Sequence, residues 1–160
     1  MRKISKSILV LSLILLATLA SFATPPKPIG DLELALDTTR FGLLIIQVSV
    51  NGREGNFIVD TGSEMTFVDA MMLSLSRVGA GRPGIGTKRG LSFRFKEAKI
   101  CLCSGDDEVY FHMPVAVANL SRIQALLGRR IDGILGVDFL RKLGSVSIDF
   151  RSKRLIVHGR

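Results

Sequence analysis

The 160-residue sequence is poor in several residue types, and each shortage narrows the classes of protein that it can encode. Two cysteines are too few for a small scaffold held together by disulfides. Charged residues make up 22% of the chain against 47% hydrophobic residues, which argues against intrinsic disorder. The length predicts one domain with a sizeable core and excludes an enzyme built from two full lobes.

Part of the hydrophobic content belongs to an N-terminal leader. Residues 1–7 carry Arg2, Lys3 and Lys6, and a short apolar run from Ile8 to Ala23 follows before Thr24-Pro25-Pro26. This pattern predicts a signal peptide over residues 1–23 and an exported protein, periplasmic or secreted. The apolar run is short for a bilayer span, so a retained membrane anchor is the weaker alternative. Cleavage after Ala23 would leave 137 residues and lower the net charge from +8 to +5.

The remaining basic residues are scattered along the chain and carry no aromatic interleaving or RNA-binding signature. We therefore predict no nucleic-acid partner. A solvated basic surface that makes loose contact with an anionic membrane surface is the alternative.

After a lead over residues 24–42, the pattern over residues 43–160 indicates one mainly β domain. Alternating apolar residues from Leu43 to Val50 predict a strand, Asn51-Gly52 a tight turn, and Phe57-Ile58-Val59 a returning strand buried on both sides. Further strands are predicted over 91–103, 109–117 and 131–136, with a final hairpin over 146–157. Short helices are predicted after Ser121, as its cap, and over 138–143 before Gly144.

Three patterns suggest chemistry that the sequence does not otherwise support. The G-x-G-x-x-G match at 79–84 contains Pro83, and no helical pattern follows it, so we reject a dinucleotide site.

The possible metal ligands are Cys101, Cys103 and His112. They supply at most three soft ligands, so we expect no metal and no other cofactor. The two cysteines are poorly placed for an unstrained disulfide. A serine hydrolase is disfavoured because only His112 and His158 could act as base and no G-x-S-x-G motif occurs.

The segment Asp60-Thr61-Gly62-Ser63 is the strongest candidate for a catalytic site. A buried strand runs directly into Asp60, Gly62 permits close approach of the backbone, and the hydroxyls of Thr61 and Ser63 can orient a carboxylate. Turns use the same residue types, so the four residues alone are weak support.

Their context strengthens the assignment. The run from Phe57 to Val68, the later segment Asp132-Gly133-Ile134-Leu135-Gly136-Val137-Asp138, and the C-terminal hairpin together resemble the retropepsin-like aspartic peptidases, in particular single-domain bacterial relatives of the retroviral enzymes. The resemblance covers about residues 43–157 and is loose between Asp69 and Arg130. It implies a closed, barrel-like β lobe of the retropepsin-like acid protease fold with two or three short helices.

The resemblance also implies roles for individual residues. Asp60 would be the catalytic aspartate, Thr61 would make a contact between lobes, and Gly62 and Ser63 would complete the loop. Ile134, Leu135 and Gly136 would brace that loop, and the glycine-dense stretch around Gly84, Ile85 and Gly86 would occupy the position of the flap over the substrate.

Peptide hydrolysis by this route needs two carboxylates that share a proton, as in aspartic proteases generally. The sequence has a single Asp-Thr-Gly, and neither Asp132 nor Asp138 is followed by Thr-Gly or Ser-Gly. We therefore expect a homodimer that joins two copies of Asp60 and cleaves a peptide or protein substrate. The alternatives are an inactive exported peptide-binding protein of the same fold and an interaction module at the envelope surface.

Overall fold

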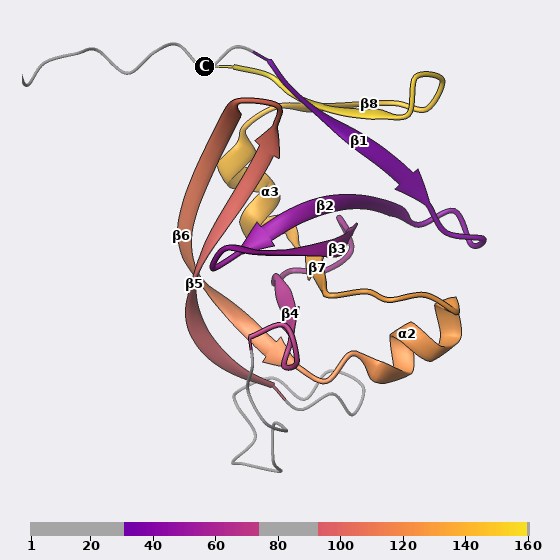
Figure 1. Cartoon of the computed structure of the whole chain (residues 1–160), viewed down its shortest axis with the longest axis vertical. Helices are drawn as coiled ribbons and strands as arrows, with labels where there is room; N and C mark the ends of the chain where they lie inside the picture. Colours follow the sequence, from indigo (N-terminus) through magenta and orange to yellow (C-terminus); the bar gives the residue numbers. More distant parts are fainter. Residues whose placement is uncertain (1–30, 74–92, 160) are drawn as a thin grey trace, which may run out of the picture. The chain divides into compact units, whose positions relative to one another are not determined.

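The computed structural model describes residues 31–73 and 93–159, and everything below concerns these residues. Nine strands and two helices follow one another along them (Figure 1). In chain order these are β1 (Leu32–Thr38), β2 (Leu44–Val50), β3 (Arg53–Val59), β4 (Phe67–Asp69), β5 (Phe93–Ser104), β6 (Asp107–Ala118), α2 (Ser121–Leu127), β7 (Gly133–Leu135), α3 (Val137–Leu143), β8 (Val146–Asp149) and β9 (Arg154–Val157).

Six of the strands close into a barrel. The sheet runs in the order β3-β7-β4-β6-β5-β2, and β2 pairs back onto β3, so that the barrel has no free edge among these six strands. The closed, mainly β lobe with two short helices confirms the predicted fold class. Its interior is filled by apolar side chains of all six strands, among them Val50, Phe57, Val68, Ile100, Val115 and Leu135, which are all buried.

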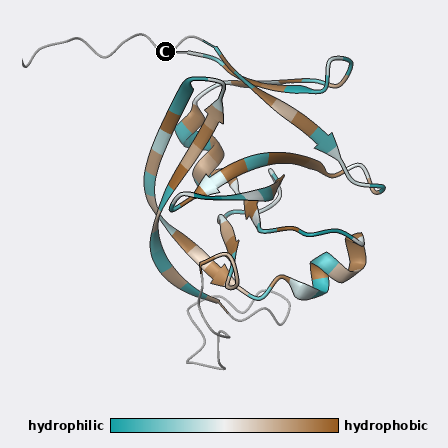
Figure 2. Cartoon of the chain, viewed as in Figure 1, coloured by the Kyte–Doolittle hydropathy of each residue, from teal (hydrophilic) through white to brown (hydrophobic). Residues whose placement is uncertain are grey.

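Two antiparallel hairpins supply most of the barrel wall. The β2–β3 hairpin turns at Asn51 and Gly52, whose φ angles of 52° and 81° confirm the predicted turn. The β5–β6 hairpin pairs twelve residues of each strand without interruption. In the middle of β6, from Val109 to Val115, buried or half-buried residues alternate with exposed ones, and this period of two directs one set of side chains to the core and the other to solvent, whereas the last four residues of β6 are all buried. Figure 2 shows both hydrophobic and hydrophilic residues along the two strands.

The remaining three strands extend the sheet beyond β2. β1 pairs with β2 through Leu36–Thr38 and with β9 through Leu32–Ala35, and the predicted C-terminal hairpin of β8 and β9 completes the sheet. Figure 1 shows this hairpin beside β1. β1 lies within the segment 24–42 that was assigned to the lead, so the sheet begins at Leu32 rather than at residue 43.

Both predicted helices are present and short. α2 begins at Ser121, but the residue in the capping position is Leu120, and no side chain caps the helix, so the predicted cap at Ser121 is displaced by one residue. α3 ends at Gly144 as predicted, and its Phe139 packs edge-on against Phe111 of β6. No helix in the described ranges has the length and apolar content needed to cross a bilayer.

Several predictions fall outside the described residues. These are the signal peptide over 1–23, the proline-rich start of the lead, and the candidate flap with Gly84, Ile85 and Gly86.

Candidate functional site

Asp60 follows the last residue of β3, where the strand leaves the barrel wall. Its N–H donates a hydrogen bond to the carbonyl of Leu135 (3.0 Å), which continues the pairing of β3 with β7 by one residue. The chain then turns. The N–H of Gly62 donates a hydrogen bond to Oδ1 of Asp60 (2.8 Å), and the N–H of Ser63 donates to the carbonyl of Asp60 (3.2 Å). The carboxylate is therefore held at the mouth of a tight loop, half-buried and open to solvent on one side.

The other predicted members of the loop differ in their surroundings. The side chain of Thr61 is exposed, and its predicted contact with a second lobe stays a prediction. The hydroxyl of Ser63 donates to the carbonyl of Met65 (2.8 Å) and so stabilises the far side of the loop rather than the carboxylate.

β7 passes directly beneath this loop. It pairs in parallel with β3 and antiparallel with β4, so that it lies between the two strands that the loop connects. The N–H of Val137, immediately after β7, donates to the carbonyl of Ser63 (2.8 Å). The structure thus brings Leu135 and Gly136 next to the Asp60 loop, with Ile134 paired to the strands on either side, and their role as a brace stays a prediction.

Gly136 is the point of closest approach between the brace and the loop. A Cβ atom at this position would lie 2.4 Å from the backbone carbon and oxygen of Met65. Its φ of −87° is open to any residue, so the lack of space, rather than conformational freedom, requires glycine here.

A second link between brace and loop was not anticipated from the sequence. Thr66 is fully buried, its hydroxyl donates to Oδ1 of Asp138 (2.7 Å), and its N–H donates to Oδ2 of the same carboxylate (3.0 Å). The hydroxyl oxygen also accepts a hydrogen bond from the N–H of Gly136 (3.1 Å). From the sequence we rejected Asp138 as a second catalytic acid and assigned it no other role, whereas in the structure it holds the end of the loop.

Two further buried carboxylates near this part of the barrel are also occupied by structural hydrogen bonds. Asp132 accepts from Nε of Arg130 (2.7 Å) and from the N–H of Asn56 (3.0 Å). Asp69 accepts from the N–H groups of Leu120 and Met71. Together with Asp138, these acids are tied to distant segments of their own chain, whereas the carboxylate of Asp60 is oriented by its own loop and reaches solvent.

The two cysteines of β5 are bonded to each other. Cys101 and Cys103 form a disulfide, with their Cα atoms 6.0 Å apart, which is within the ordinary span of such a bond. That the pair is poorly placed for an unstrained disulfide stays a prediction. His112 is not part of the cluster around them, which contains Glu108 instead.

One of the two histidines that were considered as a catalytic base, His158, contacts a serine side chain. Nε2 of His158 lies 2.7 Å from Oγ of Ser147, and its Nδ1 lies 3.3 Å from a carboxylate oxygen of Asp31. Ser147 is in the paired part of β8 rather than on the sharp strand-to-helix turn that presents a nucleophile, and all three side chains are on the surface. We interpret these two contacts as a link between β8 and the residues just before β1 and just after β9.

Comparisons with known proteins bear on the fold. No family model matches the sequence, and no curated protein matches it. Among solved structures, the chain is similar to a retropepsin-like aspartic protease from Rickettsia conorii, with a TM-score of 0.55 and 18% identity over 86% of this chain and 98% of that one. It is also similar to the retroviral protease-like domain of Ddi1 from Leishmania major, with a TM-score of 0.48 and 17% identity over 74% and 94% of the two chains. The EIAV protease in complex with the inhibitor HBY-793 matches with a TM-score of 0.38 and 16% identity over 79% and 98%.

The first of these likenesses extends over most of this chain and nearly the whole of the other, and it agrees with the closed barrel described above. The described part of this chain therefore has a retropepsin-like fold.

Proposed function

We propose that this protein is an aspartic endopeptidase. In this proposal a water molecule is activated by two carboxylates, one Asp60 from each chain of a homodimer, and attacks the scissile carbonyl of a peptide or protein substrate. One carboxylate takes the proton of the water while the other, protonated, donates a hydrogen bond to the carbonyl oxygen; the pairing is the general mechanism for which aspartic proteases are the standard example.

The observation that carries the proposal is the placement of Asp60. It stands at the end of a buried strand, its Oδ1 is oriented by the N–H of Gly62, and its backbone is tied to Leu135 of the brace. A rigid, solvent-facing carboxylate is what the activation of water requires, because the reacting groups must be held within hydrogen-bond reach of the substrate.

The second carboxylate is expected from a second copy of the chain. The acids Asp69, Asp132 and Asp138 are each held by hydrogen bonds within the chain, so none of them is available to pair with Asp60. A two-fold axis beside the loop would bring Asp60 of one copy against Asp60 of the other and would place the exposed Thr61 at the junction.

The remaining parts of the proposal concern substrate and location. An extended peptide would lie across the two copies of Asp60 and pair with the segment around Gly84, Ile85 and Gly86, in the manner of an added strand. The predicted leader supports an exported, periplasmic or secreted enzyme, anchored if the leader is retained, with loose contact of its basic surface with the membrane.

The decisive experiment compares Asp60→Asn with the wild-type protein and with Asp106→Asn, a change at an exposed aspartate in the β5–β6 turn. Purified proteins are incubated with a diverse peptide library from acidic to neutral pH, and the cleavage products are identified by mass spectrometry. We expect cleavage by the wild-type protein and by Asp106→Asn, and none by Asp60→Asn, with the same circular dichroism spectrum for all three. Full cleavage by Asp60→Asn would refute the assignment, and a wild-type protein that binds peptides without cutting them would favour the inactive alternative.

The shared site has its own test. Wild-type protein is mixed with an equal amount of Asp60→Asn, the chains are allowed to exchange, and activity per wild-type chain is measured. If each site needs two copies of Asp60, random pairing lowers this activity to about half, because half of the dimers are then mixed. An unchanged activity would mean that each chain works alone.

A further inference from the structure

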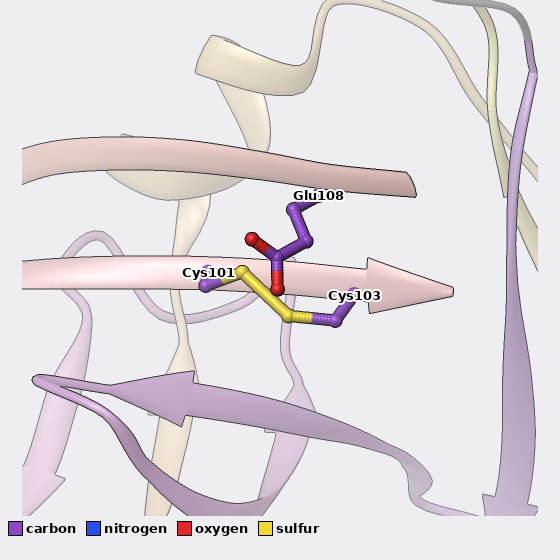
Figure 3. A group of neighbouring side chains, drawn as sticks. All are labelled: Cys101, Cys103 and Glu108. Atoms are coloured by element: carbon purple, nitrogen blue, oxygen red, sulfur yellow. A yellow bond between two sulfur atoms is a disulfide. The ribbon is translucent and has the colours of Figure 1, made fainter. Parts of the chain in front are cut away.

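The outer face of the β5–β6 hairpin carries a cluster of metal-ligating side chains away from Asp60. In the register of the hairpin, Cys101 lies opposite Tyr110 and Cys103 lies opposite Glu108, so the four side chains share one face of the ribbon. Figure 3 shows the two cysteines side by side on β5 with the carboxylate of Glu108 directed towards their sulfur atoms from β6. The two Sγ atoms and a carboxylate oxygen of Glu108 all lie within 4.8 Å of one another.

The cluster is accessible. Cys103 and Glu108 are exposed, whereas Cys101 is buried against the barrel wall. The group lines a hollow of about 210 Å³, together with Ser49, Gly52, Lys99 and Tyr110. A small ion or molecule can therefore reach the sulfur atoms from solvent.

The disulfide in this cluster contributes no link between separate parts of the fold. It joins residues only two apart on a single strand, and that strand is already held by β6 along its whole length and by β2 near Cys101. A disulfide constrains the unfolded chain less as the loop that it closes becomes shorter, so this one can stabilise the fold only weakly. A disulfide of this kind, with Cys103 exposed to solvent, is suited to reversible chemistry rather than to a structural role.

We propose that the reduced pair Cys101 and Cys103, together with Glu108, binds one Zn²⁺ ion with a fourth coordination position open to water, and that oxidation to the disulfide abolishes this site. Around a tetrahedral zinc ion, thiolate and carboxylate ligand atoms lie about 3.3 to 3.8 Å apart. The three ligand atoms here lie within 4.8 Å of one another, so small side-chain movements can bring them to these separations once the sulfur atoms are no longer bonded. On binding, the two thiols release their protons and act as thiolates. The hard carboxylate oxygen favours Zn²⁺ over Cu(I), which prefers soft ligands throughout.

Tyr110 holds the carboxylate in place, because its hydroxyl donates a hydrogen bond to Glu108. Nζ of Lys99 lies 3.8 Å from the centre of the Tyr110 ring. Two thiolates and one carboxylate around Zn²⁺ leave one surplus negative charge, and the ammonium of Lys99 is placed to compensate for it.

The sequence offered His112 as the third ligand, but the register places Glu108 nearer to Cys103 than His112. His112 lies opposite Lys99, one same-face step along the ribbon from the pair of Cys101 and Tyr110, whereas Glu108 lies directly opposite Cys103. The identity of the third ligand therefore depends on how β5 pairs with β6, and the spacing of the cysteines in the sequence does not predict this pairing.

The test uses the full chain in its two redox states. A phosphine reduces the disulfide, supplying two electrons and becoming a phosphine oxide while the sulfur atoms take up two protons from water; the phosphine is then removed without air. Zn²⁺ is titrated into the oxidised and the reduced protein against a chromophoric chelator. Cd²⁺ replaces it in a parallel titration, in which ultraviolet absorption reports thiolate coordination.

We expect one Zn²⁺ per chain for the reduced protein and none for the oxidised protein, a comparison that needs no mutation and so does not depend on the folding of a variant. Glu108→Gln should weaken zinc binding by roughly tenfold or more. Glu97→Gln, at an exposed carboxylate elsewhere on β5, and His112→Gln should leave the affinity unchanged, and a double Cys101→Ser, Cys103→Ser variant should lose the site.

The proposal fails if the reduced wild-type protein binds Zn²⁺ no more tightly than the double serine variant. It also fails if Glu108→Gln, with an unchanged circular dichroism spectrum, keeps the wild-type affinity, or if His112→Gln loses as much affinity as Glu108→Gln is expected to lose. None of these outcomes depends on Asp60 or on peptidase activity.

Discussion

The Asp60 loop and the β5–β6 hairpin are held in place in opposite ways. The loop from Asp60 to Thr66 orients the Asp60 carboxylate by its own hydrogen bonds, but its position on the barrel is fixed by Leu135, Gly136 and Asp138, which lie far later in the chain. The hairpin is fixed by its own twelve-residue register and by a turn at Gly105 that joins the two strands directly.

The difference shows which changes each region can tolerate. A side chain in the loop or in its brace contacts backbone from a distant segment, which cannot move without opening the barrel between β3 and β4. A side chain on the outer face of the hairpin contacts its cross-strand partner and solvent. We therefore expect substitutions in the loop to alter stability and the presentation of Asp60 together, and substitutions on the outer face of the hairpin to alter ligand binding alone.

The largest effect should come from Gly136→Ala. The new Cβ would lie 2.4 Å from the backbone of Met65, so the brace and the loop must separate. We expect the free energy of unfolding to fall by about 3 kcal/mol, measured by urea denaturation.

Gly105→Ala is its matched control in the hairpin. Nothing lies within 4 Å of a Cβ at this position, and the only cost is the positive φ of 59°, which we expect to be about 1 kcal/mol. Equal losses for the two variants would mean that the hairpin turn constrains its region as strongly as the distant brace constrains the loop, and the distinction drawn above would be wrong.

A smaller effect is expected for Thr66→Val, which keeps the shape of the side chain and removes its hydroxyl. The change leaves the N–H of Gly136 without its acceptor and Asp138 without one of its donors, in a fully buried position. We expect a loss of about 2 kcal/mol in the free energy of unfolding, and a loss below about 1 kcal/mol for Thr66→Ser, which keeps the hydroxyl.

The hairpin again supplies the comparison. The hydroxyl of Ser104, at the end of β5, donates to the carbonyl of Glu33 at a more open position, and Ser104→Ala should cost about 0.5 kcal/mol. If Thr66→Val were as mild as Ser104→Ala, the link from Thr66 to Asp138 would contribute little to holding the loop.

The same contrast explains how much the sequence could predict. The hairpins were visible because the period of two and the turn residues Asn51 and Gly52 are local signals. The positions of Asp60 and of Leu135-Gly136 came from a resemblance in short motifs, and the structure brings the two segments together.

What the sequence could not provide depends on pairing between distant residues. Nothing in the spacing of Thr66 and Asp138 indicates that they bond, and Glu108 could not be placed beside Cys103 before the register of β5 and β6 was known. β1 was missed for a similar reason, because half of it pairs with β9 at the other end of the chain and its own alternation follows directly on a proline-rich segment.

The smallest effect is expected for a surface bond of the same chemistry, outside both regions. Asp37 of β1 accepts a hydrogen bond from Arg129 (2.8 Å), and this bond, followed by one from the N–H of Thr38, holds the pKa of Asp37 below its ordinary value of 3.8. The Asp37 side chain is exposed and that of Arg129 is half-buried, so solvent screens the pair and it should contribute less than about 1 kcal/mol.

Because the folded state lowers the pKa of Asp37, the contribution of this pair is present above about pH 3.8 and is lost as the pH falls through the lower pKa of the folded protein. Thermal unfolding of the wild-type protein and of Asp37→Asn should therefore differ slightly at neutral pH and converge in acid. Added salt should shrink the difference at neutral pH, since exposed charges are screened. A difference that persists unchanged in acid and in high salt would show that Asp37 acts through packing, and the charge of the pair would then have no part in joining β1 to the segment after α2.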